Sequence, residues 1–208
     1  MRDRAARRAD EHDVFDILMV CTGNICRSPM AELILADALS GAVDASGRQV
    51  FRVHSAGTYG LHGYPIDAHA GRLMTDRGID PSAFRAREIT ASMVSEADLV
   101  LTATREHRAH VVTLHPRSAQ RTFTIREFAR LCTGIDPATL PPGDAVRRAR
   151  AVVAAAAAQR GMFTAPRHED DVADPYGARL TAFEASAALI TEALALPVTL
   201  LAGDQSRR

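Results

Sequence analysis

The most specific chemical signal in this 208-residue sequence is a cysteine and an arginine separated by five residues. Cys21 follows a short apolar run, and Arg27 precedes a stretch with the apolar spacing of a helix. A loop between a buried strand and a helix start collects backbone N–H groups and the positive end of the helix dipole, which together attract phosphate. The same partial charges favour the thiolate form of Cys21, which is the form that attacks phosphorus. The spacing therefore predicts a phosphate loop with Cys21 as nucleophile and Arg27 as a planar clamp for two phosphate oxygens.

The remaining residues of this loop suit an oxyanion ligand. Gly23 should let the backbone turn tightly where a side chain would block the ligand. Ser28 should cap the following helix, and its hydroxyl could also donate to the sulfur of Cys21; capping alone is the simpler alternative. A single buried cysteine is usually a small apolar residue, but packing hardly explains the whole motif. We expect the loop as a whole to bind phosphate: Thr22, Gly23, Asn24, Ile25, Cys26 and Ser28.

An acidic tract at 169–174 could supply the proton that a departing ester oxygen needs. By composition alone this tract would be a solvated loop. Asp174 differs from the other acids because Pro175 follows it, and a proline biases the preceding residue to an extended backbone that would hold the carboxylate in place. Asp174 is therefore the first candidate for the proton donor, and Asp171 is the second.

The elements around these residues predict a parallel α/β sheet. Apolar runs read as strands at 14–20, 98–102 and 121–125, and an alternating run reads as a strand at 50–55. Helical patterns lie between and after them, and the first is expected to begin with Ser28 as N-cap and Pro29 at the first helical position. Further helices are expected at 67–77, 125–131, 144–159 and 179–201. Such alternation is typical of a parallel sheet with helices on both faces.

Composition limits the partners and the compartment. Twenty-five basic and twenty-five acidic residues cancel, so charge gives no argument for nucleic acid or an anionic membrane. The longest unbroken apolar run, 151–158, is far shorter than the roughly 20 residues that cross a bilayer. Three cysteines, two of them in one short motif, do not resemble a secreted disulfide framework, and residues 1–13 lack the apolar core of a signal peptide. We expect a cytoplasmic chain with a loose extension at 1–13 and one domain at 14–208 that carries a helical insertion at about 126–170.

The segment 20–32 resembles, nearly residue for residue, the signature of the low-molecular-weight protein-tyrosine-phosphatase family. The resemblance covers 14–123, including the Ser55-Ala56-Gly57-Thr58 run, and resumes at Asp174-Pro175-Tyr176-Gly177. It implies a four-stranded, doubly wound parallel sheet of flavodoxin-like order, a phosphocysteine intermediate, and phosphotyrosine in proteins or a related phosphomonoester as substrate. It implies neither metal nor cofactor, and it assigns the general acid to Asp174.

The resemblance also implies a supporting shell. Asn24 is similar to a family asparagine whose strained backbone is held by side-chain bonds to a serine, here Ser55, and to a histidine. Phe84 stands at the place of that histidine, which predicts a less rigid loop or a substitute donor such as His54 or His62.

Three further positions follow from the resemblance. Cys26 is placed as in members where it forms a reversible disulfide with the nucleophile; a buried core thiol is the alternative. Leu61 resembles the bacterial subgroup that counteracts tyrosine autokinases, so such a kinase is one candidate partner. Tyr176 could stack on the substrate ring, as could Tyr59 or Tyr64.

Two other function classes stay open. A thioredoxin-linked arsenate reductase has a similar loop but needs a resolving cysteine pair, whereas Cys132 stands alone here. A non-catalytic phosphate-sensing or kinase-binding module is favoured by Phe84 and by the insertion, which could cap the cleft, dock a partner or simply pack on the sheet edge. Retention of Cys21, Arg27 and Asp174 together argues against such a module.

Overall fold

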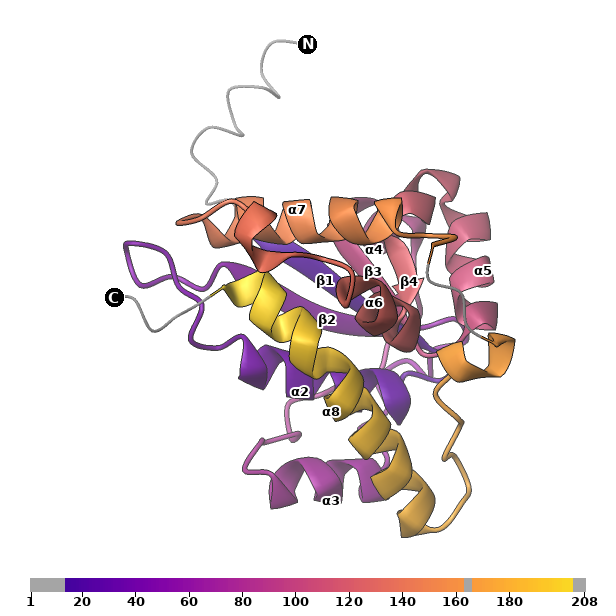
Figure 1. Cartoon of the computed structure of the whole chain (residues 1–208). Helices are drawn as coiled ribbons and strands as arrows, with labels where there is room; N and C mark the ends of the chain where they lie inside the picture. Colours follow the sequence, from indigo (N-terminus) through magenta and orange to yellow (C-terminus); the bar gives the residue numbers. More distant parts are fainter. Residues whose placement is uncertain (1–13, 163–165, 204–208) are drawn as a thin grey trace, which may run out of the picture.

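A four-stranded parallel sheet lies at the centre of the computed structural model, which describes residues 14–162 and 166–203 (Figure 1). The strands run in the order β2-β1-β3-β4, and each neighbouring pair is parallel, which confirms the flavodoxin-like order. The order reverses between β1 and β3, and ligands of open α/β sheets bind at the carboxyl ends of strands at such a point. The strand bounds are β1 Phe15–Cys21, β2 Phe51–Gly57, β3 Leu99–Thr102 and β4 Thr122–Thr124.

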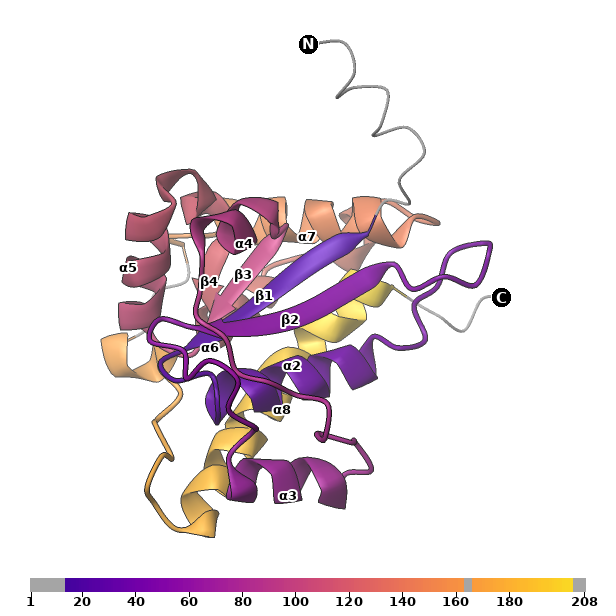
Figure 2. The ribbon, with the colours of Figure 1, turned by 180° about the vertical axis from the view of Figure 1, so that it is seen from behind.

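Helices cover both faces of the sheet, as predicted (Figures 1 and 2). One face carries α2, α6, α7 and α8, and the other carries α4 and α5; α3 packs against α2 and α8. The helix bounds are α2 Arg27–Ala38, α3 Ala68–Asp76, α4 Ala91–Glu96, α5 Arg105–Leu114, α6 Ile125–Cys132, α7 Ala145–Ala158 and α8 Leu180–Ala202. Short 3-10 turns follow α5 (η1, Pro116–Arg121), α6 (η2, Pro137–Thr139) and α7 (η3, Arg167–Asp170).

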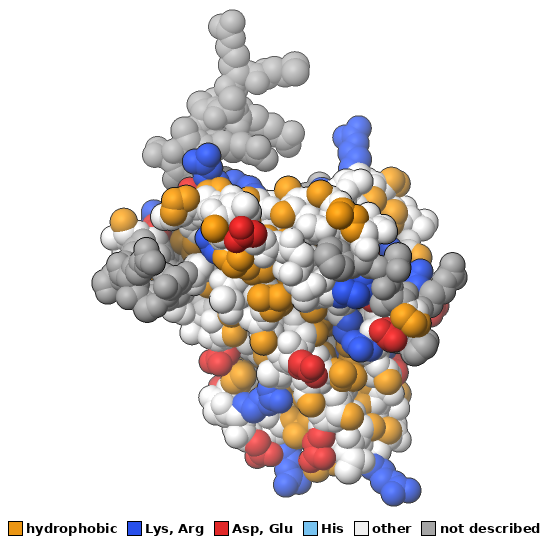
Figure 3. Space-filling view, viewed as in Figure 1, with side chains coloured by type: hydrophobic (Ala, Val, Ile, Leu, Met, Phe, Trp, Pro, Cys, Tyr) orange, Lys and Arg blue, Asp and Glu red, His pale blue; other side chains and the backbone are white. Residues whose placement is uncertain are grey.

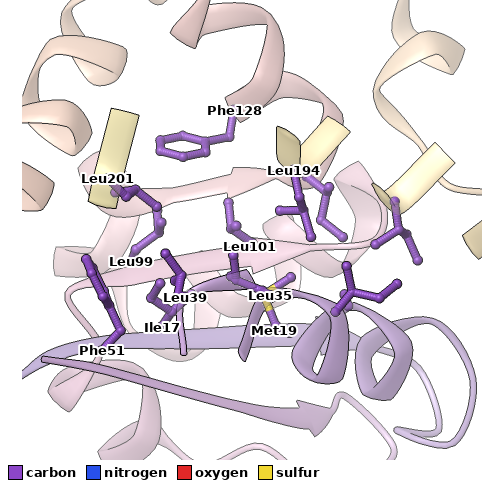
Figure 4. Packing of buried hydrophobic residues seen from close by; sticks show 14 of the residues in the cluster. Ile17, Met19, Leu35, Leu39, Phe51, Leu99, Leu101, Phe128, Leu194 and Leu201 are labelled. Atoms are coloured by element: carbon purple, nitrogen blue, oxygen red, sulfur yellow. The ribbon is translucent and has the colours of Figure 1, made fainter. Parts of the chain in front are cut away.

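The side chains of β1 divide the core into two clusters, because successive residues of a strand point to opposite faces. Ile17 and Met19 join the larger cluster, with α2, α6, α7 and α8. Leu18 and Val20 join the smaller cluster, with α4 and α5. Burial on both faces explains why β1 is apolar except at Asp16, which pairs with Arg52 and His54 of β2. Figure 4 shows the larger cluster, in which Ile17 and Met19 lie with Leu35, Leu99, Leu101, Phe128 and Leu194.

The segment between β4 and the acidic tract adds to the larger cluster. The buried face of α7 packs there beside α8, and Arg150, in the middle of α7, lies 3.4 Å from Asp98 at the amino end of β3. That end of the sheet is opposite to the end where Cys21 lies. Of the three alternatives for this segment, packing on the sheet therefore describes α7 and capping of the cleft does not; these contacts do not test docking of a partner. The buried residues of α7 are Val146, Ala149, Val152, Val153 and Ala156.

The last helix is the longest and most apolar in the described part of the chain. By length and composition α8 could cross a membrane, and it is the one such helix in the described part of the chain. It contains no long unbroken apolar run, because glutamate, serine and threonine residues interrupt its sequence. Its buried side chains nevertheless pack in the larger cluster, as predicted for a final amphipathic helix: Phe183, Ala187, Ile190, Leu194, Leu200 and Leu201.

The outer face of this layer is mixed. Figure 3 shows apolar, acidic and basic side chains interspersed over the side that α7 and α8 cover. Apolar side chains scattered in this way are common on protein surfaces.

Candidate active site

The predicted phosphate loop connects the last residue of β1, Cys21, to the first residue of α2, Arg27. The segment that follows β2 runs beside it. The N–H of Tyr59 donates to the carbonyl oxygen of Thr22 at 3.0 Å, and the N–H of Leu61 donates to that of Gly23 at 3.1 Å. These bonds turn the loop carbonyls, which would repel an anion, toward the protein.

The tight turn of the loop falls at Asn24 and not at Gly23. Asn24 is the one residue other than glycine with a positive φ, 56°, among the described residues. An added Cβ at Gly23 would meet Ile25 and Leu61 only at ordinary contact distances of 3.6 Å or more. The expectation that Gly23 provides the turn was wrong, and its small size can matter only on the ligand side. Close packing beside the loop requires glycine at Gly57 and Gly60. An added Cβ at Gly57 would lie 2.3 Å from the carbonyl oxygen of Thr22, and one at Gly60 would lie 2.1 Å from that of Arg87.

Three hydrogen bonds hold the strained backbone of Asn24. Its amide nitrogen donates to Ser55 at 2.7 Å and to Ser28 at 2.9 Å, and its amide oxygen accepts from the backbone N–H of Arg87 at 2.9 Å. A left-handed conformation is uncommon outside glycine and is tolerated best by Asn and Asp. The predicted bond to Ser55 is confirmed.

The substitute for the missing histidine is a backbone group. Neither His54 nor His62 bonds Asn24: His54 contacts Asp16 at 2.6 Å and the guanidinium of Arg87 at 2.9 Å, and His62 is exposed. Residues 87–89 pair with Gly57, and this pairing brings the N–H of Arg87 to Asn24. The prediction that His54 or His62 donates to Asn24 was therefore wrong. The backbone N–H of Arg87 holds the loop without a histidine at position 84.

Asn24 also sets the direction of the bond to the nucleophile. Both of its amide hydrogens go to serine oxygens, so each serine hydroxyl keeps its own hydrogen for another acceptor. The hydroxyl of Ser28 lies 3.0 Å from the sulfur of Cys21, and the hydroxyl of Ser55 donates to Glu32 on α2. Burial raises the pKa of Glu32. Ser28 is thereby oriented to donate to the sulfur, which favours the thiolate.

The start of α2 differs from the prediction. The helix begins at Arg27 with Cys26 as N-cap and without a side-chain capping bond, so Ser28 is inside the first turn and Pro29 is the third helical residue. The hydroxyl of Ser28 is occupied by Asn24 and Cys21 instead. The contact with sulfur is thus its observed role, and capping is not.

Arg27 reaches from the loop to the acidic tract. Its buried guanidinium donates to the carbonyl oxygen of Val172 at 3.2 Å, to the Thr22 hydroxyl at 3.3 Å and to Asp174 at 2.7 Å. Its Nε has no hydrogen-bond partner within the ranges 14–162 and 166–203. A buried N–H donor without a protein partner beside the nucleophile suits an oxyanion.

The structure separates the two candidate acids. The Asp174 side chain, about half exposed at 48%, pairs with Arg27. Asp171 instead accepts from the backbone N–H of Arg105 at the start of α5, at 2.8 Å. Asp170 pairs with Arg130 of α6 at 2.6 Å. These contacts fix the tract on the fold and direct Asp174 alone of these three acids to the phosphate loop.

Exposed apolar and aromatic side chains surround the loop. Leu61, 39% exposed, lies over Gly23, and the ring of Tyr59 contacts that of His110 with 6.1 Å between centroids. Tyr176 and Tyr64 are also exposed. Leu61 and Tyr59 therefore lie at the rim where a substrate ring could bind.

All three cysteines are free and buried. Burial, reinforced by the charges of Asp67 and Cys21, raises the pKa of Cys26 to about 12. Burial also raises the pKa of Cys132 to about 12, and this thiol packs in the larger cluster. In the described part of the chain, no three His, Cys, Asp or Glu side chains are grouped to hold a metal ion.

Sequence reasoning missed one residue of the site. His107 on α5 is buried, and its Nε2 lies 2.9 Å from the hydroxyl of Thr22. A signal was present, because a residue soon after β3 must lie near the loop that follows the neighbouring strand β1.

A buried thiol, a guanidinium and a carboxylate that meet at the end of β1 can pass a phosphoryl group to sulfur and then to water. The fold and the site thus define a cysteine-dependent phosphatase.

Comparisons with known proteins give the family. The sequence model described as Low molecular weight phosphotyrosine protein phosphatase matches residues 16–136, which takes in α6 and ends before α7. The chain is 32% identical over 174 residues to the Probable low molecular weight protein-tyrosine-phosphatase EpsP of Ralstonia nicotianae, covering 84% of this chain and 87% of EpsP. It is 32% identical over 114 residues to a Protein-arginine-phosphatase of Geobacillus stearothermophilus, covering 55% of this chain and 71% of that relative. The structure of the tyrosine phosphatase amsI of Erwinia amylovora shares the fold, with a TM-score of 0.62, 24% identity, and coverage of 92% of this chain and 96% of that one.

The chain belongs to the low molecular weight phosphotyrosine protein phosphatase family. The resemblance seen in the sequence is confirmed, and the chain is a hydrolase of this family. The arsenate reductase and the non-catalytic module are not favoured.

Proposed function

We propose that this chain hydrolyses phosphotyrosine in proteins through a phosphocysteine, with Cys21 as nucleophile, Arg27 as phosphate clamp and Asp174 as general acid. The observation that carries the proposal is the 2.7 Å contact between Arg27 and Asp174 beside the sulfur that Ser28 faces. It brings all three chemical functions to one loop. Residues 14–208 act as one phosphatase domain in this proposal.

The reaction proceeds in two steps. The Cys21 thiolate attacks phosphorus and the bond to the tyrosine oxygen breaks while Asp174 gives that oxygen its proton. Water then attacks the phosphocysteine, Asp174 takes a proton from the water, and the thiolate leaves with Ser28 as hydrogen-bond donor. Arg27 binds two oxygens of the phosphoryl group throughout, where negative charge is largest in the transition state.

Replacing Asp174 tests its role as proton donor. Asp174→Asn should lower kcat for a phosphotyrosine peptide by about 10²- to 10³-fold, because the phenolate must then leave without a proton. The loss should be much smaller for para-nitrophenyl phosphate, whose leaving group needs less help. Asp171→Asn is the matched control and should leave the ratio of the two rates unchanged. Equal losses of Asp174→Asn on both substrates would reject the role.

The side chains around the phosphate loop support phosphotyrosine as the phosphorylated residue of the substrate. Leu61, Tyr59 and Tyr176 offer apolar and aromatic surface to a phenyl ring. Phosphoarginine is the second candidate, because one relative is named for it. Rates on matched phosphotyrosine, phosphoarginine and phosphoserine peptides decide between them; preference for phosphotyrosine is expected.

A bacterial tyrosine autokinase is the proposed protein substrate, supported by the resemblance at Leu61. The balanced net charge gives no support for nucleic acid or an anionic membrane as partner, and we propose a cytoplasmic location.

Cys26 is proposed to protect the nucleophile from oxidation. Peroxide converts the Cys21 thiolate to a sulfenic acid, and attack by the Cys26 thiol on that sulfur forms a disulfide and releases water. Because the pKa of Cys26 is raised to about 12, this second step should be slow at neutral pH and accelerate as pH rises. Wild-type activity lost to peroxide should return with dithiothreitol, whereas Cys26→Ala should stay largely inactive. Full recovery of Cys26→Ala would contradict the proposal; Cys132→Ala serves as control.

A further inference from the structure

We infer that His107 is a positioning residue for the phosphate loop: its neutral ring orients the hydroxyl of Thr22 so that the hydroxyl hydrogen is offered to the bound phosphoryl group. The inference rests on the proposed function of the same loop. It adds a residue from α5, which contributes nothing to the mechanism described above.

The contacts of His107 place it between two threonines. Its Nε2 lies 2.9 Å from the hydroxyl of Thr22, the residue after the nucleophile. Its Nδ1 lies 2.8 Å from the hydroxyl of Thr104, the N-cap of α5. The residue is only 6% exposed. Both ring nitrogens are therefore engaged, and the ring links the start of α5 to the phosphate loop.

The inference places the ring proton on Nε2, and the contacts of the cap support this placement. The oxygen of Thr104 accepts the backbone N–H of His107 at 3.3 Å, so the hydroxyl hydrogen of Thr104 needs an acceptor. Among the described residues, Nδ1 of His107 is the acceptor that the structure offers it. With Nδ1 as acceptor, the proton of the neutral ring lies on Nε2, which donates to Thr22.

The hydroxyl of Thr22 can then act only as a hydrogen-bond donor to the bound ligand. Its oxygen accepts from Nε2 of His107 and from the guanidinium of Arg27, the latter at 3.3 Å. With both lone pairs used, its own hydrogen is available to a further acceptor on the side of Arg27, where the phosphoryl group would bind. In the opposite tautomer, Thr22 would donate this hydrogen to the histidine and keep none for the ligand.

The surroundings keep the ring neutral. Burial, together with the nearby positive charge of Arg27, lowers the pKa of His107 to about 4, and His110 acts in the same direction. Asp174 and Asp171 act in the opposite direction but do not offset the burial. A protonated ring would donate from both nitrogens, lose the bond from Thr104 and place a second cation beside Arg27.

A double-mutant cycle tests whether His107 acts through Thr22. His107→Leu and Thr22→Val should each lower kcat on a phosphotyrosine peptide by about 10-fold, the effect of one lost hydrogen bond to a charged group. The double variant should be no slower than Thr22→Val, because the hydroxyl that His107 orients is already gone. His107→Gln, which keeps an N–H donor, should recover most of the rate. His115→Leu, at the other end of α5, should be unchanged.

Additive losses in the double variant would overturn the inference, and so would an unchanged kcat in His107→Leu with only a lower melting temperature. A second readout does not depend on activity. Long-range ¹H–¹⁵N NMR spectra of the wild type should show His107 as one neutral tautomer, protonated at Nε2, between about pH 5 and pH 8. A charged ring or a proton on Nδ1 would refute the inference even if phosphotyrosine is hydrolysed. Absence of hydrolysis by the wild type would reject the proposed function instead.

Discussion

Cys21→Ser should lower kcat for phosphotyrosine peptides by at least about 10⁴-fold, the largest loss we expect from any single substitution. A serine hydroxyl at this position is far less acidic than a thiol, so the loop cannot hold it as an anion. The hydroxyl of Ser28 lies 3.0 Å from the sulfur in the wild type. Its hydrogen bond stabilises a thiolate strongly but contributes little stabilisation to an uncharged serine hydroxyl. Any phosphoserine that forms at position 21 should persist in single-turnover mass spectrometry, because a serine alkoxide leaves phosphorus far less readily than a thiolate.

Binding must survive for this result to report on chemistry. Tungstate should bind Cys21→Ser with an affinity close to that of the wild type, because Arg27 and the loop backbone are unchanged. Cys132→Ser, a change of the same kind in the buried core, controls for the loss of a thiol as such. A Cys21→Ser variant that retains more than about a hundredth of the wild-type rate would remove the phosphocysteine from the mechanism.

Arg27→Lys should lower kcat/KM by about 10³-fold even though the positive charge is kept. A lysine offers a single ammonium in place of a planar fork, so it cannot hold two phosphoryl oxygens at once. It also cannot reproduce the three bonds that the guanidinium makes to Val172, Thr22 and Asp174. We expect kcat to fall more than the affinity for tungstate, because the fork matters most when charge develops in the transition state.

The matched control is Arg52→Lys, an arginine that pairs with Asp16 on the neighbouring strand away from the loop. It should leave kcat/KM within about 2-fold of the wild type, as for most surface ion pairs. A loss of less than about 10-fold for Arg27→Lys would show that charge alone suffices and would contradict the role of the fork.

The local parts of the fold and site could be predicted from the sequence. β1 is recognisable because both of its faces are buried, and the loop after it because cysteine, arginine and serine stand in one short motif. The final helix was visible from the spacing of its buried residues. In each case the signal lies within one element, where the period of apolar residues carries the information.

The parts that were missed depend on contacts between distant segments. The donor to Asn24 arises only because residues 87–89 pair with Gly57. The residue type of Ser28 predicts a helix cap, but its hydroxyl instead bonds Asn24 and contacts Cys21. His107 reaches the loop because β3 lies beside β1, which strand order reveals and residue type does not.

The bond from residue 87 to Asn24 has an evolutionary consequence. An N–H of the main chain is present whatever side chain the codon at this position specifies, proline excepted. The hydrogen bond that holds Asn24 therefore depends on the backbone path at residue 87. Most substitutions of the side chain at position 87 should leave this bond in place. The side chain at position 84 therefore need not donate a hydrogen bond to Asn24. Selection can then tolerate a phenylalanine at this position in place of a histidine.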